Sequence, residues 1–370
     1  MRILIVCDFL FKYGSQQARS LAQIGHDVSM LSRSHALEFG GSTAERNEVI
    51  DVLRREGIHS FVVPGRVRSI SAVPAMLQIR RELRRWRPQI VHVHENFDPR
   101  LLALTSGYRT VFTVHDPVEH LGARSFTRSE TWIFDRWFQR AERFVVHGDA
   151  LAEELAPFVD RSRIIVIPHG VSPRCDPLPR PESPSVLLFG RLEQYKGVEV
   201  LVEAMRLVWE RRPETRLVVA GEGQAARLVP EDSRISLISR YVPEREVETL
   251  FADASLVVLP YTQASQSGVG VMAIARGVPV VVSDLGALPE LACDPSFIFE
   301  AGNPRALAET IVRHLDDGAE VRSGVLRHAQ SRFSWDRAAQ LSAELYRELT
   351  TQNGPTSPAP RRWFARGRRL

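Results

Sequence analysis

Short, almost continuous runs of Val, Ile and Leu alternate along this chain with amphipathic stretches that are long enough for helices. Strands buried on both faces have this composition, and parallel strands need crossovers between them, so the alternation predicts a parallel sheet covered by helices. The strands predicted in the first half are Arg2–Cys7, Asp27–Leu31, Ser60–Val63, Ile90–His94, Thr110–His115, Phe144–Val146 and Ile164–Pro168. The predicted helices are Ser15–Ile24, Ala72–Trp86, Ser129–Glu142 and Asp149–Pro157.

The alternation stops once and then restarts. Five prolines lie between Ser172 and Ser185, which predicts an extended linker. After it we predict strands at Val186–Phe189, Arg216–Ala220, Ile235–Ile238, Leu256–Pro260 and Pro279–Ser283, and helices at Gly197–Arg212, Glu244–Asp253, Ser267–Arg276 and Pro304–Asp316. The chain is thus expected to be an α/β protein with two Rossmann-like domains, 1–171 and 186–334, and a linker, 172–185. The two domains would face a central cleft, where ligands meet the carboxyl ends of the strands.

The C-terminal part shows no further strand. A helix over 335–350 is expected after the one over Glu320–Arg332, and it would either cap the second domain or cross back to the first. Residues 351–370 are rich in Pro and Arg and are predicted to be a disordered basic tail. The formal charge of the chain is +4, and this tail holds five arginines and no acid, so the rest is near neutral. Charge placed in this way predicts no nucleic-acid partner.

Several classes of protein are excluded by composition. No apolar run approaches the roughly 18 residues that a membrane-spanning helix needs. The apolar start of the chain is interrupted by Asp8 and has no small-residue cleavage site, so we interpret it as a strand and expect a cytoplasmic protein. The three cysteines, Cys7, Cys175 and Cys293, are far apart and form no CxxC pair, which argues against a zinc knuckle or a disulfide framework.

The segment from Gly190 to Gly197 has the sharpest chemical pattern. It follows a predicted strand, precedes a predicted helix and carries Arg191 and Lys196, although the chain has only two lysines against 46 arginines. Glycine at Gly190 lets the backbone approach a ligand, and Gly197 permits the turn into the helix. Two cations beside a helix start form a strong anion site, with the planar fork of Arg and the point charge of Lys suited to a diphosphate.

A second segment, Tyr261–Gly268, opens another predicted helix. Ser267 and Gly268 leave the first backbone N–H groups of that helix accessible to phosphate or sugar hydroxyls. Simple N-capping of the helix by Ser267 is the alternative explanation, and the residues alone leave both open.

The peptide FGRLEQYKG, Phe189–Gly197, resembles the donor-phosphate loop of family 4 glycosyltransferases, which have the GT-B fold. Other segments that resemble this family follow in its order: ARSLAQIGHDV (18–28), RPQIVHVH (87–94), FTVHDP (112–117), IPHGV (167–171), VAGEG (219–223), 260–268 and 273–280. The resemblance implies an enzyme that transfers a sugar from a nucleotide-diphosphate sugar with retention of configuration, without a required metal or other cofactor. The acceptor would be an envelope polysaccharide, a glycolipid or a small natural product.

The resemblance also implies roles for individual residues. Arg191 and Lys196 would neutralise the departing nucleoside diphosphate, and His115 would contact the donor sugar. Gly14, in the loop expected after the first strand, would let the backbone approach phosphate or acceptor, although an ordinary loop glycine explains it nearly as well. The donor would also contact the turn formed by Ser265, Gln266, Ser267 and Gly268.

The chain departs from the family at two carboxylates. The family usually has two glutamates in the second domain, one near the donor sugar and one bonded to the ribose, and Ala264 and Met272 stand at their places. A methionine cannot accept a ribose hydroxyl bond with useful strength, so those roles are not carried over. One alternative is therefore a catalytically silent protein that binds sugar nucleotides.

Two further alternatives come from the first domain. His92 and His94 lie on one face of a strand, with Asp116, Glu119 and His120 further along, so a metal-assisted hydrolase is a rival function. Arg80, Arg81, Arg84, Arg85 and Arg87 crowd one predicted helix. They are either a solvated face or, together with the basic tail, a surface for peripheral contact with an anionic membrane.

Overall fold

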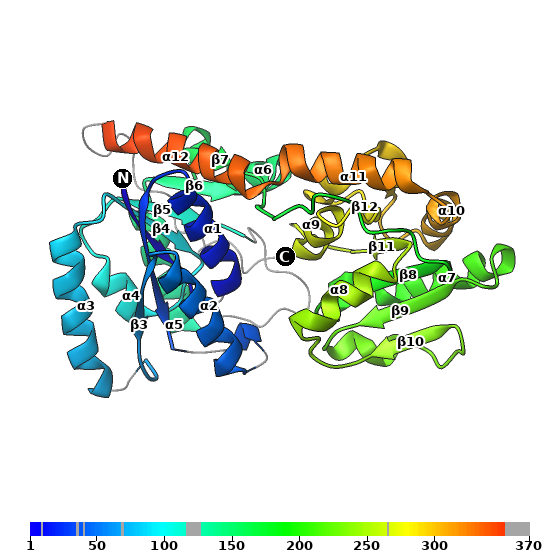
Figure 1. The fold of residues 1–370 in the computed structure, drawn as a ribbon, viewed down its shortest axis with the longest axis horizontal. Helices are drawn as coiled ribbons and strands as arrows, with labels where there is room; N and C mark the ends of the chain where they lie inside the picture. The colour runs from blue at the N-terminus through cyan, green and yellow to red at the C-terminus, as the bar shows by residue number, and fades with distance from the viewer. Residues whose placement is uncertain are drawn as a thin grey trace. The chain divides into compact units, whose positions relative to one another are not determined.

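The computed structural model describes residues 1–8, 10–34, 37–39, 41–67, 70–115, 127–264 and 266–351. Two compact units divide the chain (Figure 1). Among the described residues, the first unit holds 1–115, 127–167 and 335–351, and the second holds 168–334.

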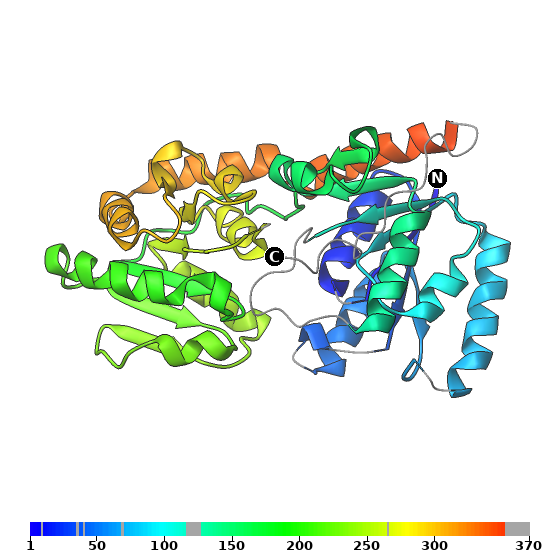
Figure 2. The ribbon, with the colours of Figure 1, turned by 180° about the vertical axis from the view of Figure 1, so that it is seen from behind.

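The first unit is built on a seven-stranded parallel sheet in the order β3-β2-β1-β4-β5-β6-β7. Its strands are β1 (Arg2–Val6), β2 (Asp27–Arg33), β3 (His59–Val63), β4 (Ile90–His94), β5 (Thr110–Thr113), β6 (Arg143–Val146) and β7 (Ile164–Val166). Its helices before the linker are α1 (Phe11–Gln23), α2 (Thr43–Arg55), α3 (Val73–Trp86), α4 (Pro99–Leu104), α5 (Arg128–Arg140) and α6 (Asp149–Leu155). Helices α1 and α2 cover one face of this sheet, and α3 and α5 cover the other, as the two opposite views show (Figures 1 and 2).

The last helix, α12 (Trp335–Thr351), packs on the first unit although it follows the second in sequence. Its buried side chains Tyr346 and Leu349 share a core with Ile3 and Leu21. The buried phenol of Tyr346 also hydrogen bonds to Nδ1 of His92 in β4. Burial of one helix face thus ties the C-terminal helix to the first sheet.

The second unit repeats the architecture with a six-stranded parallel sheet in the order β10-β9-β8-β11-β12-β13. Its strands are β8 (Ser185–Phe189), β9 (Arg216–Ala220), β10 (Ile235–Ile238), β11 (Leu256–Leu259), β12 (Val280–Ser283) and β13 (Ile298–Phe299). Its helices are α7 (Val198–Arg211), α8 (Glu244–Ala252), α9 (Gly268–Ile274), α10 (Pro304–His314) and α11 (Ala319–Arg332).

The proline-rich segment is held along the second unit. The backbone N–H groups of Arg174 and Leu178 donate to the carbonyls of Ala275 and Arg276, at 2.9 and 2.8 Å, and the Leu178 side chain is buried. Just before it, the Val171 N–H donates to the carbonyl of Phe333. The segment is extended, as its prolines predict, and its backbone groups and one side chain are satisfied by the second unit.

The predicted fold class is confirmed: both halves are parallel α/β sheets with helical crossovers. Sequence analysis missed two helices, α2 and α4, and the short strand β13. It also started the first helix too late, at Ser15. Helix α1 begins at Phe11 because the Glu38 carboxylate accepts hydrogen bonds from the N–H groups of Phe11 and Lys12, at 2.6 and 3.2 Å. That cap lies 27 residues away in sequence and leaves no local signal.

Candidate functional site

The loop Gly190–Gly197, which we call the β8 loop, is fixed by close backbone contacts with its neighbours. The Gly190 N–H donates to the Ala220 carbonyl at 3.0 Å, and a Cβ on Gly221 would lie 1.9 Å from the Gly190 carbonyl oxygen. Leu192 and Glu222 are also joined by a backbone hydrogen bond of 2.9 Å. The ends of β8 and β9 therefore touch through backbone atoms, which is possible only because glycine lacks a side chain.

The far end of the β8 loop is joined to the end of β11. Gly197 has a φ of +68°, and a Cβ there would lie 1.8 Å from the carbonyl oxygen of Pro260. Two residues after Pro260, the Thr262 N–H donates at 2.8 Å to the carbonyl of Tyr195, which lies two residues before Gly197. These contacts place the loop at the carboxyl ends of three neighbouring strands, β9, β8 and β11, where ligands of open α/β sheets bind.

Lys196 is buried at this junction, with 8% of its surface exposed. Its Nζ donates a hydrogen bond of 2.6 Å to the Tyr261 hydroxyl and lies 3.9 Å from the centre of the Tyr261 ring. Burial raises the pKa of Tyr261, and a weaker, opposing effect comes from its hydrogen bond to Ser267. The phenol is therefore neutral and adds no negative charge beside the lysine.

The second predicted segment meets the same cluster. The Ser267 hydroxyl is 2.9 Å from the Tyr261 hydroxyl and also accepts the Gly270 N–H, at 3.3 Å, as the N-cap of α9. Of the two explanations left open by the sequence, N-capping of α9 by Ser267 is confirmed. Ser267 is also linked to Lys196 through the Tyr261 phenol, and its contact with a donor stays a prediction. Gln266 and Gly268 flank it in the turn, whereas Ser265 lies outside the described residues.

Arg191 completes the charge of the β8 loop. Its side chain is exposed, and among the described residues it has no ion-pair or side-chain hydrogen-bond partner. One exposed guanidinium and one buried ammonium thus lie on the same short loop. This arrangement suits an anionic ligand that brings its own negative charge.

Two residues in this region were not found by sequence reasoning. Tyr261 was quoted only as part of its segment, because nothing local shows that its hydroxyl meets a lysine 65 residues away. His169 is the other: its Nε2 lies 4.0 Å from the Cβ position of Gly268, at the same turn. The peptide IPHGV pointed to the neighbourhood of His169 but not to this contact.

The two positions where the family usually has glutamates are occupied by Ala264 and Met272. Met272 packs with the core of the second unit, and its carbonyl accepts a 2.9 Å hydrogen bond from the Arg276 guanidinium. Ala264 is also partly buried against that core. Both positions are apolar, so neither can hold a ribose hydroxyl.

His115, in the first unit, follows β5 and is half-buried. Its Nε2 is 3.1 Å from Nδ1 of His94, and its backbone N–H donates to the Glu95 carboxylate at 2.7 Å. Nε2 of His94 is in turn 2.6 Å from Oε1 of Gln17, an acceptor, so this nitrogen of His94 carries the proton. The contact between Nδ1 of His94 and Nε2 of His115 ties the His115 ring to the end of β4.

The histidines proposed as metal ligands are used differently. His92 is fully buried, with Nε2 2.6 Å from the Thr113 hydroxyl and Nδ1 bonded to the Tyr346 phenol. Burial, and then the charge of His147, lower the pKa of His92 to about 3. Both ring nitrogens of His92 thus bond to protein groups, one to Thr113 and one to Tyr346. Across the described part of the chain, no three His, Cys, Asp or Glu side chains lie where they could hold a metal ion. Asp116, Glu119 and His120 fall outside that part.

Gly14 is not in a loop, as the sequence had suggested, and this expectation was wrong. It lies inside α1 and is buried, and a Cβ there would lie 2.7 Å from both Cβ and Sγ of Cys7. The glycine lets helix α1 approach the end of the first strand closely. This packing buries the backbone of Gly14.

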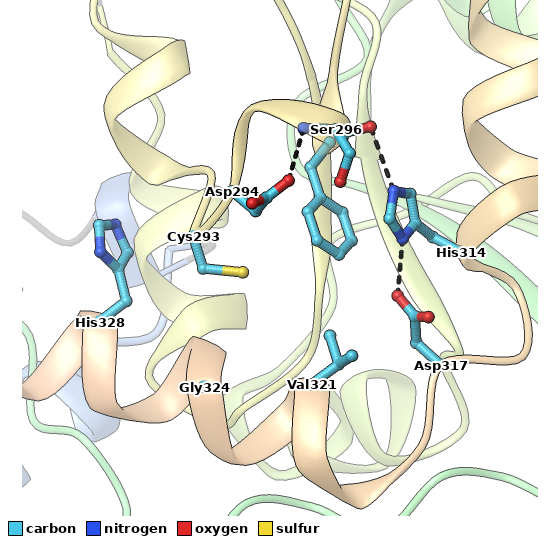
Figure 3. Close-up of a pocket in the computed structure, with 9 residues that line it drawn as sticks. Cys293, Asp294, Ser296, His314, Asp317, Val321, Gly324 and His328 are labelled. Atoms are coloured by element: carbon cyan, nitrogen blue, oxygen red, sulfur yellow. Dashed lines mark hydrogen bonds and ion pairs between the residues drawn. The ribbon is translucent and has the colours of Figure 1, made fainter.

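A hollow of about 350 Å³ in the second unit is lined by Cys293, Asp294, Ser296, Phe297, His314, Asp317, Val321, Gly324 and His328 (Figure 3). The hollow lies beside the amino end of β13, whereas the β8 loop follows the carboxyl end of β8. Because the strands are parallel, the hollow and the loop lie at opposite ends of the strands. In the hollow, His314 is bonded to Asp317 and to the Ser296 carbonyl, at 2.7 and 3.1 Å. Both ring nitrogens of His314 are thus occupied by structural bonds, and we do not assign the hollow to the site.

Comparison with known proteins gives the same two-part division. A model described as Glycosyltransferase Family 4 matches residues 13–174, and one described as Glycosyl transferases group 1 matches residues 183–317. A curated relative, glycogen synthase of Mycobacterium tuberculosis H37Rv, is 26% identical over 401 residues, which cover 96% of this chain and 94% of the relative.

Solved structures share the fold at low sequence identity. Sucrose-phosphate synthase from Thermosynechococcus elongatus is 17% identical with a TM-score of 0.70, over 95% of this chain and 99% of that one. Anabaena Alr3699/HepE, solved in complex with UDP and glucose, is 17% identical with a TM-score of 0.68, over 94% of this chain and 100% of the other. These likenesses agree with the two Rossmann-like sheets described above.

Proposed function

The chain belongs to glycosyltransferase family 4, with the GT-B fold, and we propose that this glycosyltransferase moves a sugar from a nucleoside-diphosphate sugar to an acceptor with retention of anomeric configuration. The single observation that carries the proposal is the cationic β8 loop, with Lys196 buried against Tyr261 and Arg191 exposed beside it. In this reaction the bond between the sugar and the diphosphate breaks, and negative charge grows on the leaving phosphate.

Preorganised cations stabilise that charge without having to reorganise. Removing one comparable group from an active site raises the barrier by about 3–4 kcal/mol, or two to three decades in rate. Arg191 and Lys196 supply the charge in this proposal, so it needs no metal or other cofactor. The departing phosphate itself can take the proton of the acceptor hydroxyl on the same face of the sugar, and no carboxylate nucleophile is required. That route fits the apolar Ala264 and Met272.

The donor and acceptor are proposed by class. The HepE structure contains UDP and glucose, so UDP-glucose is the first donor to test. The donor diphosphate would contact the β8 loop and the Gln266–Gly268 turn. His115, held by His94, would contact the donor sugar, and the acceptor would be a saccharide, a lipid-linked sugar or a small molecule.

A donor-panel hydrolysis screen read by mass spectrometry tests the proposal. Each nucleotide sugar is incubated with the protein, and free sugar and nucleoside diphosphate are measured. Lys196→Ala should keep the wild-type circular dichroism and lose at least tenfold in diphosphate affinity. Unchanged affinity would remove the phosphate-loop assignment.

A second candidate, a silent sugar-nucleotide-binding protein, is favoured by the apolar side chains at Ala264 and Met272. Calorimetry distinguishes the two functions. A nucleoside diphosphate that binds, with neither hydrolysis nor transfer of any donor in the panel, supports the silent protein, and release of sugar from one donor supports the enzyme.

We further propose that α3 contacts an anionic membrane from the cytoplasm. Val73 and Leu77 are 48% and 53% exposed, and with Arg80 and Arg84 they form one face of the helix at i, i+4, i+7 and i+11. Apolar side chains beside arginines suit the interface of an anionic bilayer. No helix in the described residues is both long and apolar enough to cross a membrane.

Flotation with phosphatidylglycerol-containing vesicles tests this face. The variant Arg80→Glu/Arg84→Glu should release the protein from the vesicles. The matched control, Arg206→Glu/Arg313→Glu, changes the net charge equally on exposed residues of the second unit and should bind as the wild type does. Equal loss in both variants would show a nonspecific charge effect.

A further inference from the structure

Tyr261 lies between the two segments of the proposed donor site. It lies two residues after the end of β11 and is completely buried. Its ring packs edge-on against Tyr195 of the β8 loop, with 5.9 Å between ring centres. Its hydroxyl bonds to Lys196 on one side and to Ser267 on the other, at 2.6 and 2.9 Å. One phenol therefore joins the β8 loop to the turn that starts α9.

The direction of the hydrogen bond to Lys196 follows from its chemistry. An ammonium group can only donate, so the Tyr261 oxygen accepts from Lys196. Between the hydroxyls of Tyr261 and Ser267, either oxygen can be the donor. The Ser267 oxygen also accepts the N–H of Gly270, so this hydroxyl bonds both to Tyr261 and to the first turn of α9.

The neutral phenol matters for the charge of the site. A carboxylate at the position of Tyr261 would hold the lysine equally well, but it would cancel the positive charge that a diphosphate needs. Burial raises the pKa of Tyr261, so the phenol keeps its proton and holds Lys196 as a dipole only. The aromatic face below Nζ adds a cation–π attraction that a phenylalanine would also supply.

We propose that Tyr261 is a positioning residue of the donor site, which holds the Lys196 ammonium in place for the donor diphosphate. This inference rests on the function proposed above. It adds a residue that acts through its neighbours, since Tyr261 is buried behind them. Its hydroxyl, rather than its ring, carries the effect.

A double-mutant cycle tests the inference. Calorimetry with UDP, GDP and ADP first finds the diphosphate that the wild type binds most tightly, and that probe is then used for Tyr261→Phe, Lys196→Ala and the double variant. Tyr261→Phe should weaken binding about tenfold in the wild type, the size expected for a hydrogen bond to a charged group, and less than threefold in the Lys196→Ala background. Tyr346→Phe removes another fully buried phenol and should leave the affinity unchanged.

Each outcome decides between distinct conclusions. If Lys196→Ala weakens binding but Tyr261→Phe does not, the inference is overturned and the proposed function stands. If Tyr261→Phe weakens binding equally in both backgrounds, the Tyr261 hydroxyl acts independently of Lys196, which also overturns the inference. Binding of no diphosphate by the wild type overturns the proposed function and the inference together. Should Tyr261→Phe fail to fold, Ser267→Ala removes the other hydrogen bond of the Tyr261 hydroxyl. This variant should show the same coupling to Lys196.

Discussion

Replacing Gly197 by alanine should separate the two functions of the glycine at the end of the β8 loop. The residue has a φ of +68° and a ψ of 35°, a left-handed conformation that costs an alanine about 1–2 kcal/mol. The added Cβ would lie 1.8 Å from the Pro260 carbonyl oxygen, so the two backbones would have to separate by more than about 1 Å. Overpacking of this kind costs about 1–3 kcal/mol more.

The total destabilisation expected for Gly197→Ala is therefore about 2–5 kcal/mol, which lowers Tm by roughly 4–20 °C in a domain of this size. The separation would also pull Lys196 away from Tyr261, because Lys196 precedes Gly197 directly. Diphosphate affinity should fall by the same tenfold or more as in Lys196→Ala. Thermal melting and calorimetry measure the two effects.

Gly302 offers a matched control. It has a φ of +73°, and no atom lies within 4 Å of its Cβ position, so Gly302→Ala has the conformational cost without the clash. It should lower Tm by about 2–8 °C and leave the diphosphate affinity unchanged. If both variants melt at the same temperature and bind the diphosphate equally, the contact with Pro260 does not hold the loop, and the reasoning is refuted.

Two other predictions concern the first unit. Gly14→Ala should lower the free energy of unfolding by about 1–2 kcal/mol in urea, because the 2.7 Å contact with Cys7 outweighs the gain in helix propensity; a more stable variant would contradict this packing. Burial raises the pKa of Glu38 to about 7, so the folded chain binds that proton more tightly than the unfolded chain, and stability should fall as pH rises from about 4.5 to about 7. The fall in the free energy of unfolding would reach at most about 3 kcal/mol. Denaturant titrations at pH 5 and pH 8 measure it, and Glu38→Gln should abolish it. An equal fall in the variant would show that another group is responsible.

Sequence patterns were sufficient where the signal is local. Ile90–His94 and Arg216–Ala220 were predicted with the ends that the structure has, because each short segment is rich in Val, Ile or Leu and is flanked by polar residues or turns. Helix α2 could have been found from Ser42, which caps it by accepting the N–H of Glu45. Strand β13 has two residues and no period to detect.

The position and the charged residues of the β8 loop could also be predicted, because Gly190, Arg191, Lys196 and Gly197 lie close together in sequence. The role of this loop in binding a diphosphate stays a prediction. The place of the loop between a strand and a helix follows from the alternation of apolar runs. The sequence by itself thus determined the two parallel sheets, the cationic loop and the family.

Only the tertiary structure decided what those groups touch. Parallel strands bring their carboxyl ends together across long stretches of sequence, so Tyr261 meets Lys196, and Glu38 begins a helix 27 residues before it. Such meetings depend on how sheets and helices pack, which a pattern along one chain does not record. For that reason Gly14 was expected in a loop, and the phenol that holds the lysine was not expected at all.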